Sequence, residues 1–122
     1  MNILTIEDIL GIKKQMSEKN KKNIKIFVTR LGKEMEFSPV TYSDFLDYSE
    51  KNNPEMTIIY NHCVNPNLKD DRLIKETFVP EEIVNTFLTP SERNEIAEKL
   101  CNECGIGNKD TIKVISSDIK NL

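Results

Sequence analysis

The sequence predicts a small, mainly α-helical domain of the α+β class, with several short helices and one N-terminal β-hairpin. Apolar residues alternate with polar ones over 23–38, whereas helical spacing and helix-capping residues recur over 41–105. A length of 122 residues suffices for one hydrophobic core but not for two. We therefore expect residues 1–122 to form a single domain that opens with a helix and a lysine-rich linker over 1–22.

The first expected helix begins after Thr5, which is followed three positions later by an acidic residue, Asp8. This spacing is typical of a helix-capping box, and carboxylates near a helix N-terminus also interact favourably with the helix dipole. The helix should end in the polar run 17–23, which we interpret as a solvated linker. Its apolar residues form a narrow stripe, consisting of Ile6, Ile9, Leu10 and Met16.

Residues 23–38 are expected to form the β-hairpin, because the apolar period changes there from helical to two. Pro39 closes the hairpin, since proline cannot donate to a strand ladder. The positions that carry the pattern are Ile24, Ile26 and Val28 in the first strand, a turn at Gly32–Lys33, and Met35 and Phe37 in the second strand.

Residues 41–105 are expected to form a helical body. Thr41 and Asp44 repeat the capping pattern, Pro54 is well placed to begin the next helix, and 65–67 should end it. The buried faces expected for these two helices are Tyr42, Phe45, Leu46 and Tyr48 in the first, and Met56, Ile59, Tyr60 and Cys63 in the second.

The remainder of this body should be a short helix, a turn or two, and one longer helix. Thr89, Pro90 and Glu92 combine an N-cap, an N1 proline and an N3 glutamate, and Gly105 fits the residue that ends the long helix. The tail 106–122 fits a strand or a final helix around 112–115, with a last turn over 116–119. The apolar residues expected to be buried are Leu68, Leu73, Ile74, Phe78, Ile83, Val84, Phe87, Leu88, Ile96, Ala97, Leu100 and either Cys101 or Cys104.

Charge is distributed unevenly along the chain. Residues 1–33 hold eight Lys or Arg against three Asp or Glu, a net +5, and the other 89 residues hold nine against 17, a net −8. A basic segment can bind nucleic acid, but no aromatic side chain lies between these lysines to stack on bases, and the whole chain is acidic. We therefore expect no nucleic-acid partner, and a nucleic-acid-binding regulator remains an alternative.

The N-terminus and the apolar runs also restrict the cellular location. No apolar stretch approaches the roughly 20 residues that span a bilayer, and Glu7 and Asp8 lie where a signal peptide is basic. Three cysteines, an odd number, do not suggest a disulfide framework. We expect a cytoplasmic protein with reduced thiols and no membrane partner.

Three cysteines and one histidine are the only candidates for a reactive site. Cys101 and Cys104 stand three residues apart, and His62 and Cys63 would complete a set of zinc-type ligands. However, adjacent residues point to different sides of a helix, and the cysteine pair ends its helix, where the negative dipole end disfavours a thiolate. We predict no catalytic residue, no metal site and no cofactor, with buried cysteines and a structural His62. A small zinc-binding module remains an alternative.

Several stretches, in their order along the chain, resemble one known family. They are the opening residues 4–10, the hairpin 25–37, the segment Asn65-Pro66-Asn67-Leu68-Lys69-Asp70, and the two proline-started helices between Pro80 and Gly105. Together they cover about residues 4–107 and resemble the XkdN-like tail assembly chaperones of contractile-tailed phages and phage-like particles. Pro90-Ser91-Glu92 stands where the family pattern has Pro-Gly-Glu, and the tail is less typical of the family.

The resemblance implies a non-enzymatic chaperone that acts in the cytoplasm of a bacterial host. Such chaperones keep the long tape measure protein soluble until the tail tube protein polymerises around it, so both are expected partners, as are further copies of the chain. The partner contacts should lie on the apolar stripe of the first helix, because a terminal helix on a polar linker can dock on a neighbour. Packing of this stripe on the domain's own core is the alternative. The residues concerned are Ile6, Ile9, Leu10 and Met16.

Overall fold

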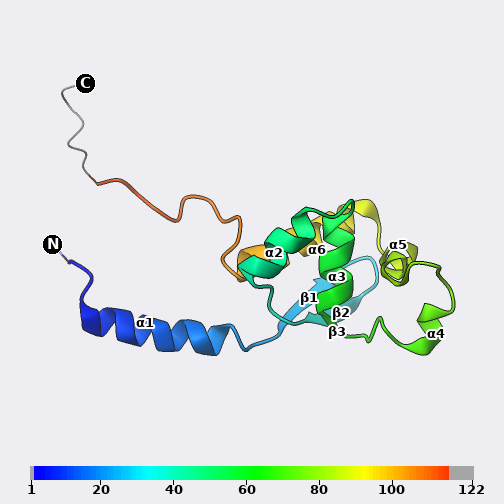
Figure 1. Cartoon of the computed structure of the whole chain (residues 1–122), viewed down its shortest axis with the longest axis horizontal. Coiled ribbons are helices and arrows are strands. Elements are labelled where there is room, and N and C mark those ends of the chain that lie inside the picture. The colour runs from blue at the N-terminus through cyan, green and yellow to red at the C-terminus, as the bar shows by residue number, and fades with distance from the viewer. Residues whose placement is uncertain (1, 116–122) are drawn as a thin grey trace, which may run out of the picture.

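A computed structural model describes residues 2–115 of the chain and gives a mainly helical α+β fold, which confirms the predicted class. The described part contains six α-helices, one 3-10 helix and a three-stranded antiparallel sheet (Figure 1). In chain order the elements are α1 (Ile6–Lys19), β1 (Ile24–Val28), β2 (Lys33–Phe37), α2 (Tyr42–Ser49), α3 (Pro54–His62), β3 (Cys63–Asn65), α4 (Asp71–Ile74), η1 (Pro80–Glu82), α5 (Ile83–Phe87) and α6 (Pro90–Glu103).

The hairpin is confirmed, but a third strand joins it. The strand order is β1-β2-β3, with Ile26 opposite Met35 in the hairpin and Phe37 opposite Cys63 across the second pair. The expectation that Cys63 lies on the buried face of a helix is therefore wrong. α3 ends one residue earlier, and Pro66 favours extended backbone in the residue before it, which allows β3 to pair with β2.

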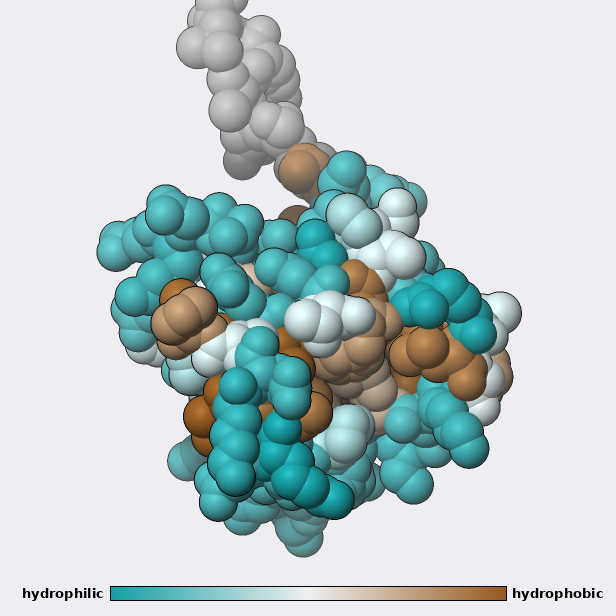
Figure 2. Space-filling view, turned by 90° about the vertical axis from the view of Figure 1, so that its right-hand side faces the viewer, coloured by the Kyte–Doolittle hydropathy of each residue, from teal (hydrophilic) through white to brown (hydrophobic). Residues whose placement is uncertain are grey.

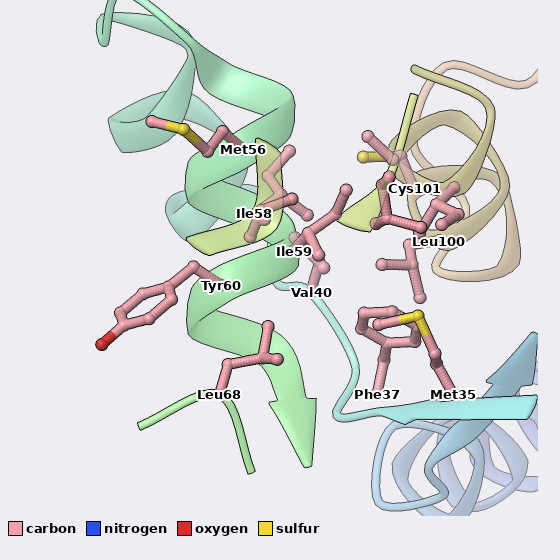
Figure 3. Packing of buried hydrophobic residues seen from close by; sticks show 14 of the residues in the cluster. Met35, Phe37, Val40, Met56, Ile58, Ile59, Tyr60, Leu68, Leu100 and Cys101 are labelled. Carbon is pink, nitrogen blue, oxygen red and sulfur yellow. The ribbon is translucent and has the colours of Figure 1, made fainter. Parts of the chain in front are cut away.

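The core lies between the inner face of the sheet and the two helices α3 and α6. Phe37 and Met35 point from β2 toward Leu100 of α6, and Ile59 of α3 lies beside them (Figure 3). Phe37, Ile59 and Leu100 are completely buried, as is Val84 of α5. These side chains join the sheet and the helical body into one hydrophobic core.

Helix ends follow the sequence signals closely. All three predicted Thr capping boxes form, at the starts of α1, α2 and α6. At the other end of α6, Gly105 has φ +78°, its N–H donates to the Asn102 carbonyl, and the Ile106 N–H donates to the Cys101 carbonyl at 2.8 Å. This is the Schellman arrangement, and it carries Ile106 into the core.

Three expectations about burial and the tail are wrong. Tyr42 and Leu46 are exposed, because the eight-residue α2 reaches the core only through Phe45 and Tyr48. Ile74 and Phe78 are also exposed, since α4 is a single turn. The tail contains neither the predicted strand nor helix over residues 107–115, and the turn expected at 116–119 lies outside the described residues.

Helix α1 projects from the body and buries none of its residues (Figure 1). It extends to Lys19, so the linker to β1 is shorter than predicted and comprises residues 20–23. Packing of its apolar stripe on the domain's own core, which the sequence left open, is not what the structure shows.

Because α6 is part of the core and α1 is not, a Leu→Ala substitution should lower the free energy of unfolding much more in α6 than in α1. Leu100→Ala should lower the free energy of unfolding by about 2–5 kcal/mol, because a fully buried leucine leaves a cavity. Leu10→Ala on α1 is the matched control and should change it by less than about 0.5 kcal/mol, since this side chain is exposed. Urea unfolding followed by circular dichroism measures both. A cost above about 1 kcal/mol for Leu10→Ala would show that α1 packs on the body.

Candidate interaction surfaces

One face of α1 gathers all four residues that the sequence predicted to contact a partner. Ile6, Ile9, Leu10 and Met16 lie within about a third of the helix circumference, and all are exposed. Ile12 extends the same face. It was missed in the sequence, although it stands three residues after Ile9 and four before Met16. Even the two least exposed members, Ile9 and Ile12, are 45% and 44% accessible, so the whole face is open to solvent.

A capping box begins α1, which buries none of its residues against the body. The Asp8 amide donates to the Thr5 hydroxyl at 3.1 Å, and the Thr5 amide donates to the Asp8 carboxylate at 3.0 Å. These bonds lower the pKa of Asp8, so its carboxylate stays charged beside the helix N-terminus. A 14-residue helix is close to the length at which an isolated helix is only marginally stable. Contact with a partner would therefore stabilise α1 as well as cover its apolar face.

On the side opposite α1, the described residues present a different surface. Apolar groups occur there as separate patches between polar side chains (Figure 2). Scattered exposed apolar residues are normal on protein surfaces, whereas a contiguous face on one helix is typical of an interaction site.

Lysines of the basic N-terminal segment gather beside β1. Lys19, Lys22 and Lys25 line one groove together with Lys99 from α6, a residue that the sequence did not associate with them. Phe27 lines the same groove and is exposed on the sheet. Part of the segment 17–23, predicted as a solvated linker, thus lines this groove.

His62 forms a buried polar cluster that joins three elements. Its Nδ1 lies 3.1 Å from the Ser38 hydroxyl, and its Nε2 lies 3.1 Å from the Tyr48 hydroxyl. Asp44 approaches Nε2 at 3.8 Å, but burial outweighs its charge and lowers the pKa of His62. Both ring nitrogens thus have partners, and these contacts link α2 and the residue after β2 to the end of α3.

The three cysteines are free; Cys101 and Cys104 lie near each other at the end of α6, and Cys63 begins β3. Burial raises the pKa of Cys63 to about 11, and burial together with the nearby Cys104 raises the pKa of Cys101. The Cys104 sulfur accepts a hydrogen bond from the Val40 N–H at 3.2 Å. Within residues 2–115, no group of three or more His, Cys, Asp and Glu side chains is arranged to hold a metal ion.

A bidentate ion pair fixes the hairpin turn to the start of α6. Arg30 Nε and Nη2 donate to the Glu92 carboxylate at 3.0 and 2.9 Å, and Nη2 also donates to the Phe87 carbonyl. The same carboxylate accepts the Thr89 N–H in the capping box. The Arg30 guanidinium and the Thr89 amide hold the pKa of Glu92 at about 2, so the carboxylate is charged at neutral pH.

Comparison with protein families, with characterised proteins and with solved structures found no match to this chain. In the described part of the chain, no helix is both long and apolar enough to cross a membrane. The resemblance noted from the sequence therefore rests on the quoted residues alone.

The buried His62 predicts a loss of stability in mild acid. Because the folded pKa lies below the unfolded value of about 6.5, the unfolded chain binds the proton first, and the free energy of unfolding falls as the pH drops below about 6.5. His62→Gln keeps a hydrogen-bonding side chain without a titration in this range and should flatten the dependence. Urea unfolding between about pH 7.5 and pH 5.5 tests this. A wild-type stability that does not change over this range would contradict it.

The raised pKa values predict slow alkylation of two thiols. In the folded protein at neutral pH, Cys63 and Cys101 should react with iodoacetamide much more slowly than in the urea-unfolded chain, because the thiolate is the reactive form. Mass spectrometry of the digested protein measures each site. Equal rates in the folded and unfolded states would contradict the raised pKa values of these two cysteines.

Proposed function

We propose that this protein is a non-enzymatic tail assembly chaperone of a phage or phage-like particle, which binds the tape measure protein in the cytoplasm of the bacterial host. The observation that carries the proposal is the uncovered apolar face of α1, a capped helix with no buried residue. The resemblance to the XkdN-like family supplies the identity of the partner.

The chemistry of α1 suits a helical client. An amphipathic helix binds a partner by laying its apolar face into a groove between other helices, or against another apolar helix. One such face gives a weak contact, but many copies bound along one long protein add their contacts through the shared scaffold. Lys13 lies between the apolar side chains on this face, so an acidic residue on the client would add to the interaction.

Co-expression with the cognate tape measure protein tests the proposal. We expect that protein, insoluble alone, to become soluble and to co-purify with many copies of this chain. Ile9→Gln combined with Leu10→Gln should abolish co-purification, since glutamine preserves helix propensity while removing the apolar contact. Lys14→Gln combined with Glu18→Gln changes polar side chains outside the apolar face of α1 and is the matched control.

Two results of this experiment would contradict the proposal. A tape measure protein that stays insoluble beside folded, full-length chain would show that the function is wrong. Solubilisation that survives Ile9→Gln with Leu10→Gln would show that the client binds elsewhere. Sedimentation of the purified chain addresses self-association separately: if α1 joins two copies, the same double substitution should convert an oligomer to a monomer.

A further inference from the structure

A groove runs along the outer edge of β1, between this strand and α6. Its volume is about 750 Å³ beside the first part of β1 and about 410 Å³ beside the last part. Ile26, Phe27 and Lys99 line both parts, so the two parts adjoin along β1.

The residues that line the groove place it at the edge of the sheet. Ile24 and Ile26 pack toward the core, whereas Lys25 and Phe27 are exposed on the opposite face, as the alternation of a strand requires. All four line the groove. Only the edge of the strand is adjacent to both sets of side chains, so the groove follows the backbone of β1.

One face of α6 forms the opposite wall. The contributing positions recur every three or four residues along the whole helix, as one helical face does. Arg30 and Glu92 tie this wall to the sheet at one end, and Cys104 contacts Val40 at the other. The residues of α6 that line the groove are Glu92, Glu95, Ile96, Lys99, Asn102 and Glu103.

No strand pairs with the outer edge of β1 within residues 2–115, where β1 is the end strand of the sheet. The outward N–H and C=O groups of an edge strand are a template for another strand. An edge strand with an open groove beside it can bind an extended peptide through main-chain hydrogen bonds. The five residues of β1 correspond to about 17 Å, the length of an added strand of about five residues.

The charge of the groove selects among such strands. Beside the first part of β1 the groove is lined by Lys19, Lys22, Lys25 and Lys99 and by one carboxylate, that of Glu103. Glu95 lies 3.9 Å from Lys99, and Glu36 is opposite Lys25 on β2, so Lys19 and Lys22 carry most of the groove's free positive charge. An incoming strand with carboxylates would therefore be attracted, and one with lysines would be disfavoured. The chain's own exposed segment 111–115 has alternating apolar residues but carries a lysine and no carboxylate.

We propose that this groove binds an extended segment of a partner protein, in which apolar side chains alternate with polar ones that include carboxylates. The segment adds to β1 as a further strand, its apolar side chains contact Ile26 and Ile96, and its carboxylates lie beside Lys22 and Lys99. The site is separate from the apolar face of α1, so the inference stands without the proposed function.

Selection from a library of random nine-residue peptides by the full-length protein tests the inference. We expect the enriched peptides to be acidic and to alternate apolar with polar residues. Lys22→Glu combined with Lys99→Glu should weaken the best peptide at least about ten-fold, whereas the matched control Lys51→Glu with Lys75→Glu, at exposed lysines outside the groove, should not. Enrichment without acidic character, or equal losses in both variants, would overturn the inference.

Backbone methylation of the selected peptide tests strand addition directly. Only alternate N–H groups of an added strand face β1, so N-methylation of one alternate set should abolish binding while methylation of the other set leaves it intact. Equal effects of both sets would overturn strand addition.

The groove has two alternative occupants, the chain's own tail and nucleic acid. Each gives a different result in these assays, and either result would overturn the assignment of the groove to a segment of a partner protein. If the chain's own tail fills the groove, Ile112→Asp with Val114→Asp should raise peptide affinity about ten-fold by removing a competitor. If the lysines of the groove bind nucleic acid, a fluorescent deoxythymidine 20-mer should displace the peptide. The affinity of the 20-mer should then fall steeply as the salt concentration increases.

Discussion

The apolar inner face of the sheet is the constraint on which the rest of the structure depends. A sheet of two or three strands is stable only when one face is covered. α3 and α6 provide the cover, with Ile59 and Leu100 against Phe37, and α2 and α5 then pack mainly on α3. Because both covering helices lie on one face of the sheet, its other face and the edge of β1 remain open to solvent.

Two surfaces are thus left uncovered for different reasons. α1 is separated from the body by four polar residues and contributes nothing to the core. The groove stays open because α6 runs beside β1 and is held there at its two ends, by Arg30 and by the Val40 N–H. One surface matches an amphipathic helix and the other an extended strand, so the two proposed partners need not compete.

Local signals in the sequence were sufficient for most of the fold. Threonine caps, the proline at the start of α6 and Gly105 act within a few residues, and the hairpin alternation is equally local. β3 was missed because three residues carry no periodicity, and their strand depends on pairing with β2. The apolar stripe on α1 was predictable from its spacing. Its exposure to solvent was not, because this depends on whether another part of the chain packs on the stripe. The Arg30–Glu92 pair joins residues 62 apart, and Lys99 reaches the groove only through the packing of α6.

Gly11 lies in the middle of α1, and apart from its chain neighbours and the nearby helix backbone no atom lies within 4 Å of the position that a Cβ would occupy there. Glycine destabilises a helix interior by about 1 kcal/mol relative to alanine. Because a Cβ would fit at this position, α1 is less stable than the same helix with alanine there would be. In an isolated, solvated helix of this length, such a residue favours fraying and transient opening of the backbone. The amide protons of α1 should therefore exchange rapidly with solvent while its apolar face is free. Their protection would then report directly the fraction of molecules in which a partner covers this face.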